Sequence, residues 1–259
     1  MAQNLRRMFI SRKRQQVLPI SLLFLILTSC NTLFLPTKAE HSSYRVTPSM
    51  PKDSAMVSLM QPYKDSVERG MNRVIGEAAI TLEKDQPAGT LNNFMADAMY
   101  VMAKQKYGVP IDAAFVNYGG IRITQLAAGP VTTGKIFEVM PFDNLLILQQ
   151  VKGSVLQQFL DLTAAWGGWP VAGMTMQIQN KKAVNVKIGG QPLDLNKTYT
   201  IANSDYVANG GDNAAMLKSI PQQSNGYLMR DAIFDYIKML QAQGKNISVN
   251  EDNRVSNAQ

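Results

Sequence analysis

Apolar residues recur at helical spacing in three segments of the chain. Within each segment their positions differ by three, four or seven residues, which places them along one face of a helix. The stripes are Met56, Leu59, Met60, Tyr63 and Val67; Leu91, Phe94, Met95, Ala98, Met99 and Met102; and Met229, Ile233, Tyr236, Ile237 and Leu240. We therefore predict three amphipathic helices. Pro62 should kink or divide the first, and Gly108 and Pro110 should end the second.

Several short segments between these helices have the pattern of β-strands. Residues 73–82 alternate, residues 112–116 and 145–151 are apolar runs, and residues 173–206 hold alternating segments separated by turn residues. Such runs, bounded by glycine, proline and asparagine, predict strands in antiparallel or mixed pairing. A last strand is predicted around Ile247.

One further helix is predicted directly after the strand at residues 145–151. Ser154 and Gln157 have the spacing of a capping box, for a helix that continues through Thr163. Helices and strands thus mix along the chain without a strict alternation of one with the other. The pattern predicts an α+β fold, in a single domain with mixed or antiparallel sheets flanked by helices.

The N-terminal thirty residues follow a different pattern. A basic stretch precedes the apolar run at residues 19–27, which is shorter than the roughly 20 apolar residues that span a bilayer as a helix. The run ends in Leu27-Thr28-Ser29-Cys30, which resembles a bacterial lipobox, and Cys30 is the only cysteine. We expect a lipoprotein signal peptide with lipid attached to Cys30. The alternative is a free thiol beside an ordinary signal peptide.

These features divide the chain into three parts. Residues 1–29 are expected to be the signal peptide, residues 30–52 a lipidated tether, and residues 53–259 the folded domain. The protein is then exported and anchored by lipid to a bacterial membrane, on its periplasmic or cell-surface face.

The positive charge of the chain is concentrated at its N-terminus. The formal net charge is +7, and five of the 26 basic residues lie within the first 14 positions, whereas none of the 19 acidic residues precedes residue 30. A nucleic-acid-binding domain would keep its basic surface after cleavage. We therefore expect no nucleic-acid partner.

Three loop segments carry residues that suit ligand binding. Residues 117–122 pair Gly119 and Gly120, which let backbone N–H groups approach a ligand, with Arg122, a planar donor for phosphate or sugar oxygens. Residues 139–144 place an aromatic directly after a proline, and residues 203–212 end a strand in a glycine turn. Two simpler explanations remain open. In one, residues 117–122 form a plain turn with a surface arginine. In the other, the aspartate at the end of the third segment caps the next helix.

Taken together, these segments resemble the C-terminal domain of the 5′-nucleotidase family, which includes UDP-sugar hydrolases. Residues 91–97 and 189–194 extend the resemblance, which covers about residues 55–250. It implies that Phe142 and Tyr206 sandwich a nucleobase and that Asp212 accepts hydrogen bonds from sugar hydroxyls. It also implies that Asn117 and Arg122 contact the base and the phosphate side of the ligand, while Gly119 and Gly120 shape the loop.

The sequence departs from the family pattern at three positions. Tyr206 replaces the usual phenylalanine, which preserves stacking and adds a hydroxyl group. Tyr118 replaces a glycine, which narrows the expected pocket. Asp85 stands where a second phosphate-binding arginine is usual, although Lys84 is adjacent. Because an acid there repels phosphate, we expect nucleosides to bind about as well as nucleotides.

The residues needed for hydrolysis are not found in this sequence. Family enzymes cleave phosphate esters at a two-metal centre in a separate N-terminal domain, which needs several histidines and carboxylates. This chain has one histidine, His41, within the predicted tether. We therefore expect no catalytic residue, no metal ligand and no cofactor here, with divalent metals only in a partner.

Two functions of different class remain. In the first, the chain recognises nucleosides or nucleotides for a separate metallophosphatase polypeptide, as part of a split 5′-nucleotidase in nucleotide catabolism. In the second, it is a stand-alone lipoprotein that binds nucleosides or similar aromatic ligands without a catalytic partner.

Overall fold

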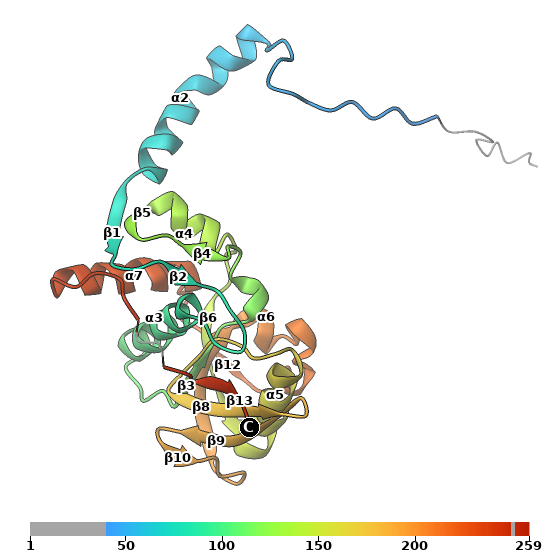
Figure 1. Cartoon of the computed structure of the whole chain (residues 1–259), viewed down its shortest axis with the longest axis vertical. Coiled ribbons are helices and arrows are strands. Elements are labelled where there is room, and N and C mark those ends of the chain that lie inside the picture. Colours follow the sequence, from blue (N-terminus) through green and yellow to red (C-terminus); the bar gives the residue numbers. More distant parts are fainter. Residues whose placement is uncertain (1–39, 250–251, 259) are drawn as a thin grey trace, which may run out of the picture. The chain divides into compact units, whose positions relative to one another are not determined.

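The structure is a computed structural model that describes residues 40–249 and 252–258 (Figure 1). The chain divides into two compact units, residues 1–53 and 54–259. The predicted signal peptide, Cys30 and the first part of the predicted tether lie outside the described residues. The second unit holds all the helices and strands of the described residues.

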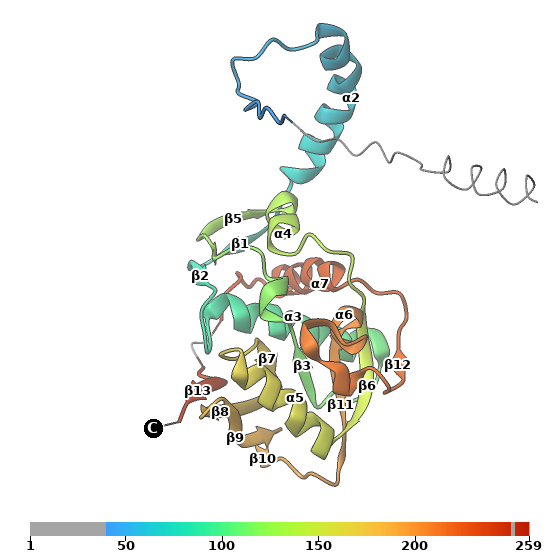
Figure 2. The same cartoon turned by 90° about the vertical axis from the view of Figure 1, so that its right-hand side faces the viewer.

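A five-stranded mixed sheet forms the centre of this unit (Figure 2). Its strands, in spatial order, are β12 (Gln222–Gln223), β6 (Leu146–Lys152), β11 (Thr198–Ser204), β3 (Ala113–Phe115) and β7 (Val171–Ala172). Strand β11 pairs antiparallel with β6 along its whole length and parallel with β3. This pairing decides which loops meet at the edge of the sheet.

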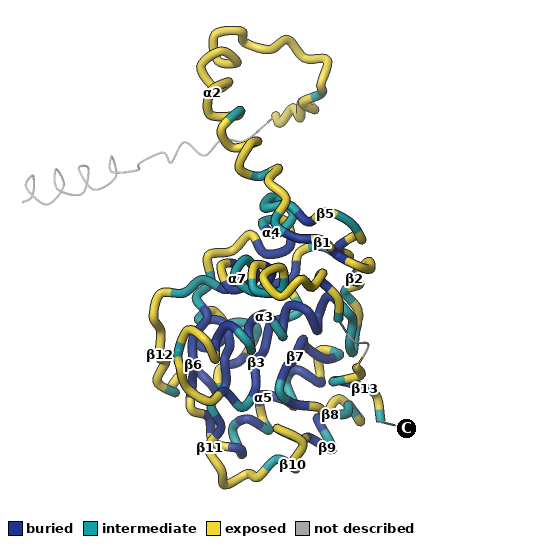
Figure 3. Tube along the Cα trace, turned by 90° about the vertical axis from the view of Figure 1, so that its left-hand side faces the viewer, coloured by how far each residue is buried: buried dark blue, intermediate teal, exposed yellow. Residues whose placement is uncertain are grey.

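Helices cover both faces of the central sheet. One face packs against α3 (Thr90–Tyr107), on which α7 (Met229–Ala242) packs in turn, and the other face packs against α5 (Gly153–Ala165). Strand β3 shows the division, because Ala114 belongs to the core with α3, whereas Phe115 contacts Phe159 of α5 with ring centroids 5.1 Å apart. Neighbouring residues of a strand point to opposite faces, so the sheet is buried on both sides (Figure 3).

Smaller sheets and helices surround this centre. A four-stranded sheet lies next to α5, in the order β10 (Gln191–Pro192), β9 (Lys182–Ile188), β8 (Met174–Gln179) and β13 (Val255–Asn257). Two-stranded sheets are formed by β1 (Val74–Ala78) with β5 (Gly129–Thr132) and by β2 (Leu82–Glu83) with β4 (Gln125–Leu126). The short helices are α4 (Thr133–Val139), α6 (Asp205–Ala208) and the 3-10 turns η1 (Tyr118–Gly120), η2 (Gly211–Asn213) and η3 (Ala215–Leu217).

The predicted helices and the fold class are confirmed. Helices α3 and α7 span the predicted stripes, and α3 ends at Gly108 in the left-handed conformation, as predicted. The α+β class, with mixed and antiparallel sheets flanked by helices in one domain, is confirmed as well. No helix among the described residues is both long enough and apolar enough to cross a membrane.

The first helix differs from its prediction. Helix α2 runs from Ser54 to Met71 as one element, so Pro62 does not divide it. None of its 18 residues is buried (Figure 3), so its apolar stripe stays exposed. Proline lacks the N–H that would donate to Ser58 O, and at an exposed position water can satisfy the freed carbonyl.

Two strand predictions are wrong in part. Residues 73–82 form two strands, β1 and β2, because the chain turns away between them. There Ala79 N donates to Ile247 O (2.9 Å) and Ile247 N donates to Glu77 O (2.7 Å). Ile247 itself forms only an isolated bridge with Ala78, and the last strand is β13.

The predicted capping box is also wrong. Helix α5 begins at Gly153, and Lys152 caps it without a side-chain hydrogen bond, so Ser154 lies inside the first turn. Backbone carbonyls take over the capping. Gly153 N donates to Lys197 O (2.7 Å) and Ser154 N donates to Leu195 O (2.9 Å). The free N–H groups at the start of a helix can donate to any such acceptor.

Candidate functional site

One cavity of about 330 Å³ gathers all the ligand-binding residues predicted from the sequence. It has the volume of a small-molecule pocket. Its lining consists of Asn117, Gly119, Gly120, Arg122, Phe142, Asn144, Tyr206 and Asp212. Seven of these were predicted, and Asn144 is the addition.

The sheet topology explains why three distant loops meet here. Strands β3 and β11 are parallel neighbours, so the loop after β3, with Asn117, and the turn after β11, with Tyr206, leave the same edge. Strand β6 is antiparallel to β11 and therefore starts at that edge, where the loop with Phe142 enters it. Ligands commonly bind at this end of parallel strands.

A reciprocal pair of hydrogen bonds fixes the distance between the two aromatic loops. Asp205 N donates to Leu145 O (3.0 Å), and Leu145 N donates to the Asp205 carboxylate (3.0 Å). The same carboxylate oxygen accepts from Tyr206 N (2.8 Å). Asp205 thus ties Leu145, which directly precedes β6 and lies three residues after Phe142, to Tyr206, which carries the second ring.

Phe142 is held through its backbone by a buried arginine. Arg230 of α7, only 8% exposed, donates through Nη1 to Phe142 O (3.1 Å) and pairs through Nη2 with Asp143. Phe142 as a residue is 41% exposed. An anchored backbone with a partly exposed aromatic residue suits contact with a ligand better than packing in a core.

Tyr206 is fixed by the turn that follows it. Its ring lies on Gly211, where a Cβ atom would come within 2.5 Å of the Tyr206 Cζ atom. Its hydroxyl donates to Asp212 Oδ1 (3.0 Å) and accepts from Asp212 N (3.3 Å). Tyr206 is nevertheless 44% exposed, and it lines the cavity.

Asp212 also contacts the first loop. Asn117 Nδ2 donates to Asp212 Oδ2 (2.9 Å). A Cβ atom at Gly120 would lie 2.7 Å from Asn117 Oδ1, which explains the glycine there, whereas one at Gly119 would meet nothing within 4 Å. Asp212 adopts a left-handed conformation (φ 49°) within η2 and does not cap a helix. Such a conformation is uncommon outside glycine and often marks functional loops.

Arg122 lines the cavity, and a second positive charge, that of Lys84, lies near enough to interact with it electrostatically. Lys84 Nζ donates to Ile121 O (2.8 Å) and lies 4.0 Å from the centroid of the Tyr118 ring. The pKa of Lys84 is lowered by burial and then by the positive charge of Arg122. Among the described residues, no carboxylate forms an ion pair with either side chain. Adjacent unpaired cations attract an anion.

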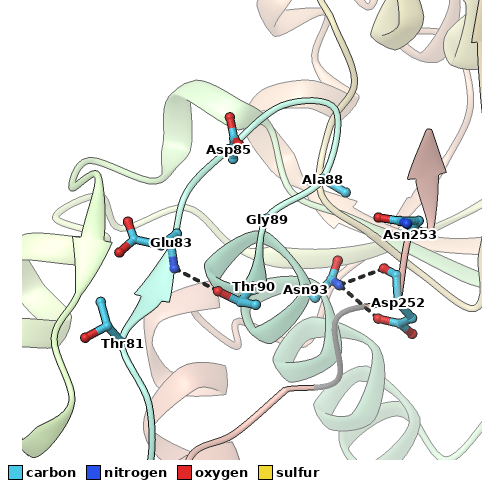
Figure 4. Close-up of a pocket in the computed structure, with 9 residues that line it drawn as sticks. All are labelled: Thr81, Glu83, Asp85, Ala88, Gly89, Thr90, Asn93, Asp252 and Asn253. Carbon is cyan, nitrogen blue, oxygen red and sulfur yellow. Dashed lines mark hydrogen bonds between the residues drawn. The ribbon is translucent and has the colours of Figure 1, made fainter. Parts of the chain in front are cut away.

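Asp85 lines a different cavity of about 270 Å³ (Figure 4). Glu83 and Asp252 line it too, and Asn93 Nδ2 donates to the Asp252 carboxylate there (2.9 Å). The charge of Asp85 does reach Tyr118, whose pKa is raised by burial and then by this carboxylate. The predicted repulsion of phosphate by Asp85 is therefore opposed by the attraction of phosphate to the positive charge of Lys84.

The described residues do not fit a two-metal hydrolytic centre. His41 is the only histidine in the sequence. Within residues 40–249 and 252–258, no three histidine, cysteine or carboxylate side chains are grouped so as to hold a metal ion. We assign no hydrolytic step to these residues.

Sequence reasoning missed the residues that support the cavity. Asn144 belongs to a segment that was already singled out, so its neighbours pointed to it. Arg230 and Asp205 act through backbone contacts that only the folded chain brings together. Lys84 was noted only as the neighbour of Asp85.

Comparison with protein families and known proteins gives consistent matches. A family model described as "5′-nucleotidase, C-terminal domain" matches residues 74–219. The protein UshA of Yersinia enterocolitica is 28% identical over 209 residues, covering 78% of this chain and 38% of that protein. A 5′-nucleotidase of Vibrio parahaemolyticus is 28% identical over 198 residues, covering 72% and 34%.

A solved structure shows the same relationship. The 5′-nucleotidase precursor from Thermus thermophilus superimposes with a TM-score of 0.67 and 26% identity, covering 81% of this chain and 44% of that chain. The present chain therefore spans less than half the length of these three proteins.

Proposed function

The chain belongs to the family of 5′-nucleotidase C-terminal domains, and from this premise we propose that it recognises nucleosides and nucleotides for a 5′-nucleotidase-type hydrolase system. The hydrolytic metal centre of that system is then supplied by a separate metallophosphatase polypeptide. The role belongs to nucleotide catabolism.

The observation that carries this proposal is a pair of aromatic rings at one cavity. Phe142 comes from the loop before β6 and Tyr206 from the short helix α6. They are 41% and 44% exposed and line the same 330 Å³ space. An aromatic ring stacks on any nucleobase with about 1–3 kcal/mol. Burying such rings in a core would give more stability, so their exposure favours a ligand.

The polar groups of the cavity match the rest of a nucleotide. Asp212 offers acceptor oxygens for sugar hydroxyls, and Asn117 offers an amide for the base. Arg122 in the cavity lining, with Lys84 near it, supplies positive charge for a phosphate group. The ligand class is therefore nucleoside or nucleotide, with phosphate tolerated in spite of Asp85.

The proposed division of labour rests on the chemistry that hydrolysis needs. The described residues hold no group of three histidine, cysteine or carboxylate side chains that could bind a metal ion, so the proposal assigns them recognition and assigns hydrolysis to a partner. A stand-alone binding lipoprotein is the alternative, and a metallophosphatase that forms a complex with this chain distinguishes the two.

The lipobox-like sequence at residues 27–30 supports an exported, lipid-anchored location. In this proposal, lipid on Cys30 holds the binding domain on the periplasmic or cell-surface face of a bacterial membrane, where it can meet nucleotides from the surroundings. Acyl chains on that residue give stable anchoring.

The proposal is tested with a ligand panel on the full-length protein. Adenosine, uridine, AMP and UMP should each bind in calorimetric titration, whereas ribose 5-phosphate, which has no base to stack, should bind at least about tenfold more weakly. Equal binding of ribose 5-phosphate and AMP would show that the site reads phosphate alone. No binding of any nucleoside or nucleotide would contradict the proposed function.

A further inference from the structure

The cavity of about 270 Å³ beside α3 carries an excess of negative charge. Its described lining includes the carboxylates of Glu83, Asp85 and Asp252 and holds no lysine or arginine (Figure 4). Among the described residues, Glu83 and Asp85 form no ion pair, and Asp252 shares Arg254 with Asp97. The N-terminus of α3 adds a partial positive charge of only about half a unit. The carboxylates outweigh it, so the cavity attracts cations.

A buried amide offers this cavity an acceptor that has no donor. Asn93 is only 4% exposed and yet lines the cavity. Its Nδ2 atom donates to the backbone oxygen of Asp252 (3.1 Å) and to the Asp252 carboxylate (2.9 Å), which fixes the amide. Figure 4 shows the nitrogen turned to Asp252 and the oxygen turned away from it. No donor among the described residues bonds that oxygen, so it is free to accept from a ligand.

The neighbouring Asn92 gives the same signal. Its Nδ2 atom donates to Asp85 O (2.7 Å), whereas its buried Oδ1 atom has no partner among the described residues. A Cβ atom on Gly89, which lines the cavity, would lie 3.3 Å from this oxygen. Buried polar atoms are seldom left without a partner. Two such acceptors at one acidic cavity therefore point to a ligand that donates hydrogen bonds.

The spacing of the carboxylates suits an organic cation better than a metal ion. Calcium needs oxygen ligands at about 2.3–2.6 Å, and no three carboxylates of the described residues are grouped closely enough to hold a metal. Glu83 and Asp85 precede α3, whereas Asp252 belongs to the segment before β13 (Figure 4). An ammonium group hydrogen-bonds a carboxylate at about 2.7–2.9 Å, and a diamine carries two such groups several bonds apart. The carboxylates of the two segments can therefore bind one ammonium group each.

We propose that this cavity is a binding site for a short aliphatic diamine. One ammonium group is held by Glu83 and Asp85. The other is held by Asp252 and by the amide oxygen of Asn93. The site shares no lining residue with the cavity of the proposed function, so it stands independently of nucleotide binding.

Calorimetric titration of three probes into the full-length protein at low ionic strength tests the proposal. The probes are 1,4-diaminobutane, 1-aminobutane and 1,4-butanediol, which carry two, one and no positive charges on similar chains. The diamine should bind at least about tenfold more tightly than the monoamine, because it engages both groups of carboxylates. The diol should not bind. Added NaCl should weaken diamine binding by screening the charges.

Two variants locate the binding at this cavity. Glu83→Gln and Asp85→Asn each remove one charge and keep the shape of the side chain, so each should weaken diamine binding about three- to tenfold. Glu77→Gln is the matched control, because it removes an exposed carboxylate of β1 that does not line the cavity. Its diamine affinity should equal that of wild type.

Four results would overturn the inference. The first is no diamine binding by wild type. The second is equal binding of diamine and monoamine, which indicates a site for a single ammonium group such as a lysine of another protein. The third is displacement of the diamine by an equal concentration of CaCl₂, which indicates a metal site. The fourth is wild-type diamine affinity in both Glu83→Gln and Asp85→Asn, which indicates binding elsewhere on the surface.

Discussion

Replacing Arg230 tests whether the Phe142 loop is positioned from the core. Arg230 is 8% exposed and reaches the loop from α7, where Nη1 lies 3.1 Å from Phe142 O and 3.5 Å from Met140 O. Arg230→Met keeps an unbranched apolar side chain but removes these donors. It leaves two carbonyls of the loop without their partner.

The expected cost follows from the contacts. The shared Nη1 contact counts as about one hydrogen bond from a charged group, worth about 1.5–3 kcal/mol. The ion pair with Asp143 adds less than about 1 kcal/mol, since that side chain is 76% exposed. Arg230→Met should therefore lower the free energy of unfolding by about 2–4 kcal/mol, and Asp143→Asn should lower it by less than about 1 kcal/mol.

The binding assay separates positioning from general destabilisation. A loop that has lost its anchor should lose much of the stacking on Phe142, so adenosine should bind about tenfold more weakly to Arg230→Met. Ile233→Ala is the matched control, because it lies on the same helix, is fully buried and should cost about 2–5 kcal/mol. Ile233 makes none of the hydrogen bonds that hold the Phe142 loop.

Urea unfolding and calorimetric titration at a temperature where all variants are folded give both quantities. Anchoring by Arg230 is refuted if Arg230→Met is as unstable as Ile233→Ala and yet binds adenosine with wild-type affinity. The position of Phe142 would then be set by Asp205 and the start of β6 alone.

Three further outcomes are expected. Burial and then the charge of Arg122 lower the pKa of Lys84. AMP affinity in titrations should therefore fall as pH rises through that lowered pKa, while adenosine affinity stays level. If a Lys84→Met variant shows the same loss of AMP affinity at alkaline pH, Lys84 is not the group responsible. In Gly153→Ala the new Cβ atom would lie 2.0 Å from the carbonyl oxygen of Asp194. The free energy of unfolding measured in urea should therefore fall by more than about 3 kcal/mol. A decrease below about 1 kcal/mol would contradict that packing. Cys30→Ala should move the folded protein from the membrane to the soluble fraction after cell fractionation, and retention in the membrane would count against lipidation.

The residues around the cavity could be predicted because they are poor choices for structure alone. Paired glycines at a strand end and an aromatic directly after Pro141 have little use in a core, and both Phe142 and Gly120 do line the cavity. The strands themselves followed from their apolar runs. Their parallel or antiparallel pairing, which brings the loops together, depends on contacts between distant segments that one sequence does not display.

Arg230 shows what sequence reasoning misses. An arginine in the first turn of an amphipathic helix looks like an ordinary surface charge, and only the folded chain places it under the Phe142 loop. Helix α2 shows the opposite case. Its apolar residues have a spacing like that of α3, which predicts a buried face, yet none of its residues is buried. Periodicity predicts a helix and its apolar face, but not what covers that face.

Capping at α5 fails for a related reason. Ser154 and Gln157 have suitable spacing, yet the N–H groups of Gly153 and Ser154 find carbonyls of the segment at residues 195–197. A tertiary contact has replaced the local one, which no pattern of neighbouring residues reports.

The most direct measurement is the adenosine affinity of wild type, Phe142→Ala and Tyr206→Ala, with the free energy of unfolding measured on the same samples. Trp166→Ala serves as control, because Trp166 is 54% exposed and is not among the residues that line the cavity. If the two rings hold the base, each of their variants should bind adenosine about ten- to a hundredfold more weakly. Each should also keep its stability within about 1.5 kcal/mol, less than the roughly 3–5 kcal/mol that truncating a core aromatic costs. Unchanged affinity in both variants would contradict the account.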